Sequence, residues 1–265
     1  MLLVVLVALA GCSLPSGDLT GATETPTDDG SDDPTPSPTP AFSYPAGYGE
    51  TGVENVSRAL ETHRSTLTGA SGFQVVYSAA VEGGDRSSVV TYEMRAEPPS
   101  ERALLRFDVT SENVEGFYAQ YYDNDTMYVA SRQPGDENTT YSQTSQSYSA
   151  DQFAGSDWLF RPVLENVSFE SSRVATRDGE RLVEYSEGRL RDSGQLPTGR
   201  LQSGNVTDFS ATMVVGPDGY VRSLEYRATV VDGGAERRLS VSIQVRNVGE
   251  TTVEEPSWKD RATSS

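Results

Sequence analysis

Apolar and polar residues alternate along most of the chain between residues 73 and 245. This period of two is typical of β-strands, because successive side chains of a strand point to opposite faces of the sheet. Turn-forming residues interrupt it at Gly83-Gly84-Asp85, Gly216-Pro-Asp-Gly219 and Asp232-Gly-Gly234. The pattern predicts strands over 73–81, 90–96, 103–109, 117–122, 127–129, 181–185, 209–215, 220–230 and 239–245.

A spacing of three to four residues between apolar positions occurs in segment 52–68 instead. Its apolar stripe consists of Val53, Val56, Leu60, His63 and Leu67. That spacing places the side chains on one face of a helix, and Gly69 and Gly72 then end it. A second, less regular segment, 153–164, is also predicted to be helical.

Regularly spaced strands with tight turns predict an antiparallel sheet of about nine to eleven strands. Because one face of so wide a sheet is apolar, the sheet should curl around the helical segments. We expect one α+β domain over residues 46–258. Its strongly curved, half-barrel sheet should carry the N-terminal helix and the second helical segment on its concave side.

The first residues have the pattern of an export signal. The apolar run Leu2–Ala10 fits a signal-peptide core and is about half as long as a membrane-spanning helix. It ends in Leu9-Ala10-Gly11-Cys12, which resembles a lipobox, so we expect a signal peptide over 1–11 and a lipid on Cys12. The alternative is a short buried helix with an incidental cysteine. Only Met1 precedes the run, so the positive charge of the signal comes either from the amino terminus or from an upstream start, such as a twin-arginine pair.

Segment 12–45 is rich in Thr, Pro, Asp, Gly and Ser and has too few apolar groups to fold. We interpret it as a disordered tether that separates the domain from the membrane, and we expect 259–265 to be a disordered tail. Cys12 is the only cysteine, so the domain has no internal disulfide.

The chain is strongly acidic, with 39 acidic and 21 basic residues and a formal net charge of −18. Lys259 is its only lysine. A surface of this kind favours solubility where salt screens the repulsion, so the composition indicates a halophilic archaeal source. It argues against nucleic acid as a partner, because no basic patch exists to neutralise phosphates.

Asn-x-Ser/Thr sequons are more numerous than the Ser and Thr content alone suggests. They indicate a glycosylated, extracellular surface, and their asparagines are Asn55, Asn124, Asn138, Asn166 and Asn205.

The order of these features resembles that of known lipoproteins. A lipobox, a low-complexity tether, an N-terminal helix and long strands broken by Gly216-Pro-Asp-Gly219 resemble the LolA-like and LppX-like lipoprotein carriers. The carboxyl end, Ser242-Ile-Gln-Val-Arg-Asn-Val-Gly-Glu-Thr-Thr-Val-Glu-Glu-Pro-Ser-Trp258, is similar to an uncharacterised family of haloarchaeal lipoproteins. The resemblance to the carriers implies a curved sheet that holds lipid acyl chains.

Motifs for catalysis or metal binding are weak. Gly47-Tyr-Gly-Glu-Thr-Gly52 matches G-x-G-x-x-G, but a Pro-rich segment precedes it where a dinucleotide site needs a strand. His63 is the only histidine, so neither a histidine-pair zinc site nor a second imidazole is available. Asp123 and Asp125 lack the spacing of a calcium loop. We therefore expect no enzyme, no cofactor and no metal.

Aromatic and methionine side chains in the strands and the second helical segment form either an ordinary core or the lining of a ligand cavity. The candidate lining residues are Tyr77, Tyr92, Met94, Phe107, Trp158, Phe160 and Met213. The first alternative predicts a structural or interaction module of the cell surface with a filled core. The second predicts a membrane-anchored protein that binds an apolar ligand, such as a lipid or an isoprenoid.

Overall fold

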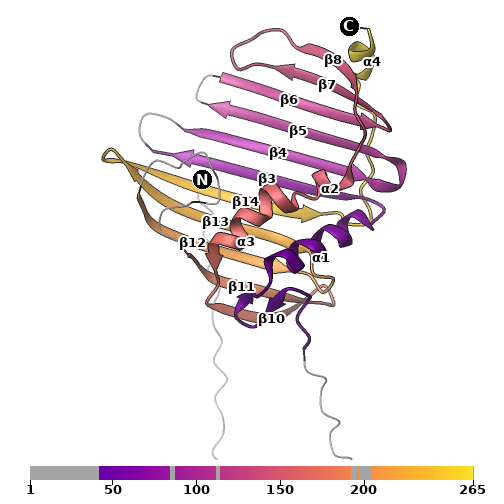
Figure 1. Ribbon diagram of the computed structural model, residues 1–265. Helices are drawn as coiled ribbons and strands as arrows, with labels where there is room; N and C mark the ends of the chain where they lie inside the picture. The colour runs from indigo at the N-terminus through magenta and orange to yellow at the C-terminus, as the bar shows by residue number, and fades with distance from the viewer. Residues whose placement is uncertain (1–41, 84–86, 112–113, 192–195, 197–204, 265) are drawn as a thin grey trace, which may run out of the picture. The chain divides into compact units, whose positions relative to one another are not determined.

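Most alternating segments form long antiparallel strands joined by turns (Figure 1). In this computed structural model the described residues are 42–83, 87–111, 114–191, 196 and 205–264. The strands are β1 (Tyr48–Gly49), β2 (Gly52–Val53), β3 (Phe73–Glu82), β4 (Ser88–Glu97), β5 (Arg102–Ser111), β6 (Val114–Asp123), β7 (Thr126–Arg132), β8 (Thr140–Ser145), β9 (Val167–Ser168), β10 (Ser171–Arg177), β11 (Glu180–Leu190), β12 (Asn205–Val215), β13 (Val221–Asp232) and β14 (Ala235–Arg246).

Helical segments are shorter. They are α1 (Val56–Thr68), the 3-10 turn η1 (Pro98–Ser100), α2 (Ala150–Phe153), the π-helical turn η2 (Ser156–Phe160), α3 (Arg161–Asn166) and α4 (Lys259–Thr263). The helical predictions for 52–68 and 153–164 agree with α1 and with the α2–η2–α3 segment, except at the start of the first. Residues 52–53 form β2 instead, because they pair with Tyr48 and Gly49 in a hairpin. Cys12, the predicted signal peptide and residues 12–41 of the tether lie outside the described residues.

Within the described residues, a 12-stranded sheet has the order β10-β11-β12-β13-β14-β3-β4-β5-β6-β7-β8, and β9 pairs with β11. The order begins and ends at different strands, so the large curved sheet is open, and the fold is roughly α+β. The antiparallel pair β14–β3 joins the two halves of the chain, with Ile243 opposite Tyr77. The count is one above the predicted range, because the polar strands β8 and β10 and the short β9 were not expected.

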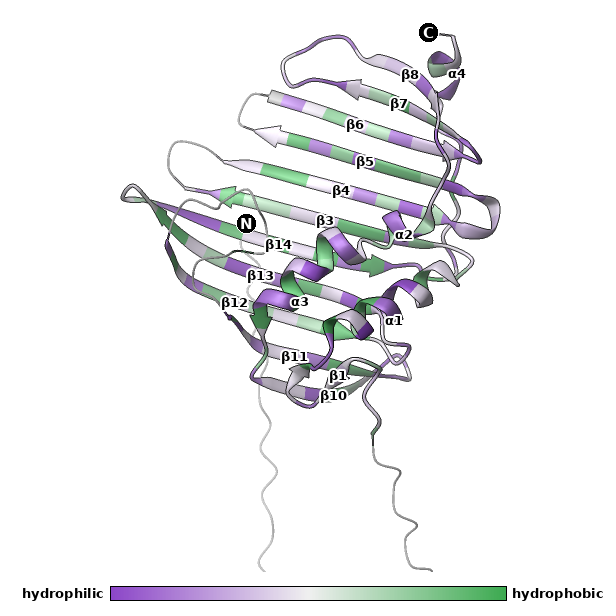
Figure 2. Cartoon of the chain, viewed as in Figure 1, coloured by the Kyte–Doolittle hydropathy of each residue, from purple (hydrophilic) through white to green (hydrophobic). Residues whose placement is uncertain are grey.

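The sheet has two different faces. Alternate residues of each strand, such as Val75, Tyr77 and Ala79 in β3, are on the face that contacts the helical segments; we call this the helix face and the opposite one the outer face. Figure 2 shows hydrophobic and hydrophilic residues alternating along the strands. The predicted period of two is therefore the basis of the fold.

The helix α1 is capped at its N-terminus by Asn55, whose side chain accepts a hydrogen bond from the Arg58 backbone N–H at 2.9 Å, and at its C-terminus by Gly69. The side chains on its buried face are Ala59, Leu60, His63 and Leu67. A turn of the sheet also packs against it, since the Thr66 hydroxyl donates to the Asp218 carbonyl at 2.9 Å. Gly219 has φ of 79°, and a Cβ there would lie 2.5 Å from Thr62 Cγ2, so glycine is required.

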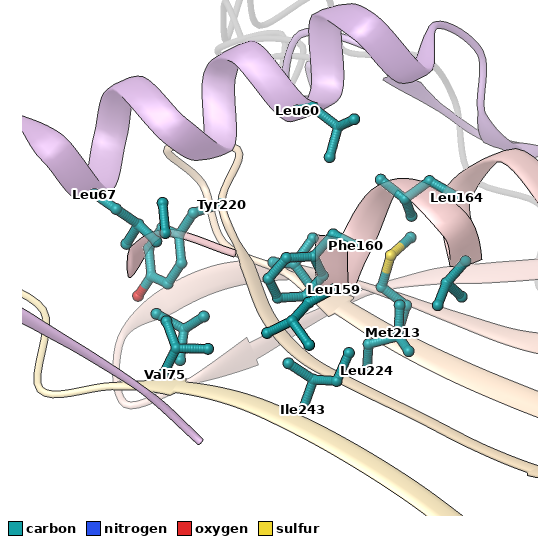
Figure 3. Close-up of a cluster of buried hydrophobic side chains, with 14 of the residues drawn as sticks. Leu60, Leu67, Val75, Leu159, Phe160, Leu164, Met213, Tyr220, Leu224 and Ile243 are labelled. Carbon is teal, nitrogen blue, oxygen red and sulfur yellow. The ribbon is translucent and has the colours of Figure 1, made fainter. Parts of the chain in front are cut away.

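Side chains from α1, η2, α3 and the strands interdigitate in one core (Figure 3). Leu60 and Leu67 reach it from α1, and Phe160 and Leu164 reach it from the second helical segment. In Figure 1, α1 and α3 lie over the β11–β14 part of the sheet, and β5–β7 extend beyond them. The helical segments thus cover only part of the helix face.

The carboxyl-terminal segment follows the outer face instead of ending in the predicted disordered tail. Lys259 Nζ donates to Asp123 Oδ2 and to Glu255 Oε2, both at 2.8 Å, and Ala262 of α4 is fully buried. The ammonium also lies 5.5 Å from the Tyr121 ring centroid and 5.1 Å from that of Tyr128. The hydrogen bond from Lys259 lowers the pKa of Asp123. These contacts order residues that are too polar to predict a helix.

Candidate ligand-binding site

One row of side chains crosses the helix face perpendicular to the strands. The register places the following residues directly opposite one another in turn, and we call them the cross-strand row: Met213, Leu224, Ile243, Tyr77, Tyr92, Phe107, Tyr118, Ser131 and Thr140. Neighbouring members sit one strand apart, about 4.8 Å. The row changes from aliphatic to aromatic and then to hydroxyl-bearing along its length.

The aliphatic end of the cross-strand row is filled core. Met213, Leu224 and Ile243 are each no more than 1% exposed, and they pack beneath the helical segments (Figure 3). Two more predicted lining residues, Met94 and Phe160, are also fully buried. Close packing at these positions means that Met94, Phe160 and Met213 belong to the core in this structure.

The aromatic middle of the row is less covered. Ring centroids of Tyr77 and Tyr92 are 5.5 Å apart, and those of Tyr92 and Phe107 are 4.5 Å apart. Trp158 of η2 meets Tyr92 edge-on at 5.4 Å and remains 44% exposed. The other three rings are partly buried. These four predicted lining residues therefore form one aromatic cluster at the border of the region that the helical segments cover.

The hydroxyl end of the row was not predicted as part of a site. Gln120 Nε2 donates to the Tyr118 hydroxyl at 2.7 Å, and the hydroxyls of Ser131 and Thr140 are 2.9 Å apart. Thr140 and the next helix-face residue of β8, Ser142, are exposed. The aromatic run around Tyr118 could have indicated a strand, but the polar sequence of β8 gave no signal that it lies beside the aromatic residues.

His63 connects three parts of the fold. Its Nδ1 accepts from the Val221 backbone N–H at 3.1 Å, so its Nε2–H donates to the Ala154 carbonyl at 3.0 Å. Its ring centroid lies 4.5 Å from that of Phe160, and no part of the residue is exposed. Burial lowers the pKa of His63 to about 4, although the bond to Ala154 opposes the shift. His63 is therefore a neutral residue that joins α1, α2 and β13.

The G-x-G-x-x-G segment forms the small β1–β2 hairpin, with Tyr48 opposite Val53. A Cβ on Gly47, which has φ of 90°, would lie 2.4 Å from the Ala59 backbone nitrogen. The glycine therefore allows the hairpin to approach α1 closely.

The described residues contain no group of three or more His, Cys, Asp or Glu side chains placed to hold a metal ion.

The sequon asparagines differ in their surroundings. Asn55 caps α1, and Asn124 has φ of 54° in the β6–β7 turn. Asn138 and Asn205 are exposed, whereas Asn166 is partly buried and its Nδ2 donates to the Pro162 carbonyl at 2.8 Å. The amide nitrogen that a glycan would modify is thus already hydrogen-bonded at Asn166.

None of the helices in the described ranges combines the length and apolarity needed to cross a bilayer.

A model of a family of unknown function (DUF7537) matches residues 1–262. No curated protein matches the chain. Among solved structures, it is similar to a DUF1329 family protein from Desulfovibrio piger, with a TM-score of 0.30 and 8% sequence identity. That alignment covers 78% of this chain and 98% of the other. A likeness at this level carries no argument about the site.

Proposed function

Given that the chain belongs to DUF7537, a family of unknown function, we propose that it is an extracytoplasmic lipoprotein that binds an apolar ligand. The ligand is a lipid or an isoprenoid, and the protein is held on a membrane by lipid on Cys12. In this proposal α1 and the Trp158 segment lie on the concave side of the sheet, and the ligand lies beside them over β3–β5. The acidic composition further suggests a haloarchaeal source.

The observation that carries this proposal is the partial exposure of the aromatic cluster. The rings of Tyr92 and Phe107 lie against each other on the helix face, yet only Trp158 among the described helical residues has a ring contact with them. Large apolar side chains that stay accessible in a row are typical of a surface that another apolar molecule covers. An acyl or isoprenoid chain lying across the strands would bury them.

A second candidate is a surface module without a ligand. The full burial of Met94, Phe160 and Met213 favours it, because these residues were candidates for a cavity wall and instead fill the core. In this alternative the aromatic cluster is an ordinary core margin.

Tryptophan fluorescence separates the two candidates. In the chain carrying Trp258→Phe, Trp158 is the only tryptophan and lies against Tyr92. Titration with a long-chain lipid should shift its emission to shorter wavelength and saturate, because the ligand would displace water from the exposed part of the indole. A linear or absent response supports the surface module.

Two phenylalanines on neighbouring strands provide a matched pair. Phe107 faces the helix side, and Phe117 lies on the outer face, with Arg106 and Arg132 over its ring at 5.6 Å each. Phe107→Ala should weaken the fluorescence response at least tenfold, whereas Phe117→Ala should leave it unchanged. Phe107→Ala should also cost clearly less than the roughly 3–5 kcal/mol typical of a packed core, because its ring is not fully covered. A full core penalty at Phe107 together with an unchanged response contradicts the proposed site.

The anchor is tested at the cysteine. Cys12→Ser removes the only thiol, so the variant should remain an uncleaved precursor or be released into the medium. Membrane fractionation and intact-protein mass measure both outcomes. A processed Cys12→Ser protein that still pellets with membrane contradicts the lipid anchor.

A further inference from the structure

Charged side chains are distributed unequally between the two faces of β3–β8. On the helix face, the described residues of these strands are all Phe, Tyr, Val, Leu, Met, Ala, Gly, Ser, Thr or Gln. Charged residues of the same strands, such as Glu93, Arg95, Arg106 and Asp108, alternate with them on the outer face, where they form ion pairs. In a chain with 23% charged residues, the helix face of these strands is uncharged.

Polarity on this uncharged face increases in one direction. Along the cross-strand row the aromatic rings of Tyr92 and Phe107 are followed by the hydroxyls of Tyr118, Ser131 and Thr140. From β3 to β8 the row spans about 24 Å, at about 4.8 Å per strand. A molecule lying along it would contact rings with one end and neutral hydrogen-bonding groups with the other.

An anionic head group would find no cation on this part of the face. Arg161 is the cation nearest to Trp158 in sequence, and it is already paired with Asp157 at 2.7 Å and Glu165 at 3.3 Å. An anion placed over Ser131 and Thr140 would lose hydration without gaining an ion pair, which is costly. A hydroxyl head group would exchange its water for Ser, Thr and Tyr hydroxyls at little cost.

We propose that the helix face of β3–β8 selects a long-chain lipid with an uncharged, hydrogen-bonding head group. The hydrocarbon chain lies over Tyr77, Tyr92 and Phe107, and the head group lies over Ser131, Thr140 and Ser142. This inference rests on the proposed function, since it assumes that the face binds a lipid.

Two probes with the same hydrocarbon chain test the selection. Geranylgeraniol carries a hydroxyl group, and geranylgeranyl phosphate carries a phosphate in its place. Binding is followed by Trp158 emission in the Trp258→Phe chain, in about 1 M NaCl, so that the net charge of −18 is screened beyond about 3 Å. The alcohol should bind at least tenfold more tightly than the phosphate.

A positive charge placed on the face should reduce or remove this preference. Ser142 and Ser145 are both exposed on β8, but they lie on opposite faces of the sheet. Ser142→Arg should strengthen binding of the phosphate at least tenfold, and Ser145→Arg should leave both affinities unchanged. Neither substitution buries a side chain, and thermal melts check that both variants fold.

The outcomes distinguish the inference from the proposed function. Saturable binding of both probes with equal affinity, or tighter binding of the phosphate by the unmodified face, overturns the head-group selection and leaves lipid binding intact. An equal effect of Ser142→Arg and Ser145→Arg also overturns it, because the effect would then come from net charge. Absence of saturable binding by either probe defeats the proposed function and the inference together.

Discussion

The neutral state of His63 contributes to stability in a pH-dependent way. Its folded-state pKa of about 4 lies below the ordinary value of 6.5, because burial disfavours the charged imidazolium. Protonation would also remove the acceptor at Nδ1 that the Val221 N–H uses. Between pH 6.5 and pH 4 the unfolded chain therefore binds a proton that the folded chain does not.

Because the unfolded chain binds the extra proton, we predict that the protein loses stability as the pH falls. The contribution of His63 is fully present above pH 6.5, decreases toward pH 4 and then levels off, by about 3 kcal/mol in total at 1.36 kcal/mol per pKa unit. Urea unfolding at a series of pH values in high salt measures it. His63→Gln keeps a neutral donor and acceptor but does not titrate in this range. Because the carboxylates contribute equally to both proteins, the free energy of unfolding of the variant should fall by about this amount less between pH 6.5 and pH 4. Parallel profiles would mean that the pKa of His63 is the same in the folded and unfolded states.

Sequence patterns predicted the side of α1 on which His63 lies but not its hydrogen bonds. A stripe at three- and four-residue spacing depends only on local geometry. The partners of His63, Ala154 and Val221, are backbone groups from distant parts of the chain and have no side-chain signal. Likewise, the alternation placed Met94 and Phe107 on the correct face, but the position of the helical cover decides which of them is buried.

At the scale of elements, the strands that the sequence did not predict are polar. β8 has the sequence Thr-Tyr-Ser-Gln-Thr-Ser, and β10 contains Val174 as its only large aliphatic residue. Both are edge strands, which are held by one ladder of backbone hydrogen bonds and need not bury side chains. A method based on apolar alternation therefore predicts the interior of the sheet and misses its edges. This is also why the hydroxyl end of the cross-strand row was missed.

The carboxyl-terminal segment depends on contacts that no local pattern shows. Lys259 is only 15% exposed and lies between Asp123 and the more exposed Glu255. Its ammonium group lies over the rings of Tyr121 and Tyr128 on the outer face of β6 and β7. Together with the hydrogen bond from Arg261 to the Tyr141 hydroxyl at 3.1 Å, this ammonium attaches α4 to the sheet.

Lys259→Met should destabilise the protein by about 1–3 kcal/mol, because it removes charged hydrogen bonds from a site with little water. Asp123→Asn should cost a similar amount, and the double variant should cost less than the sum, since both remove the same interaction. Glu255→Gln is the control: its carboxylate is 55% exposed, so its loss should change stability by less than about 1 kcal/mol. Urea unfolding measures the free energy of unfolding of these four variants against that of the unmodified protein. Unchanged stability in Lys259→Met would show that α4 is not held by this contact.

At the scale of the whole molecule, charge and fold are arranged together. Alternation along β3–β8 places the ionic groups on the outer face, so the acidic surface does not extend over the uncharged helix face. Composition alone indicates an acidic chain. The distribution of that charge became visible only with the strand register, because a one-residue change of register exchanges the two faces.

The net charge of −18 predicts that stability rises with salt. Folding brings the carboxylates together, and their repulsion acts over about 10 Å at 0.1 M salt but only about 3 Å at 1 M. Salt also weakens exposed ion pairs such as Arg106–Asp108, but each contributes at most about 1 kcal/mol, so the unpaired acidic excess should dominate. The melting temperature should therefore increase steeply from low to molar NaCl. Sodium sulfate at the same ionic strength is the control, because it also strengthens apolar burial. Equal increases of the melting temperature in the two salts indicate screening, and a larger increase in sulfate indicates an added hydrophobic contribution. A melting temperature that does not change with NaCl contradicts the interpretation of the acidic surface as an adaptation to salt.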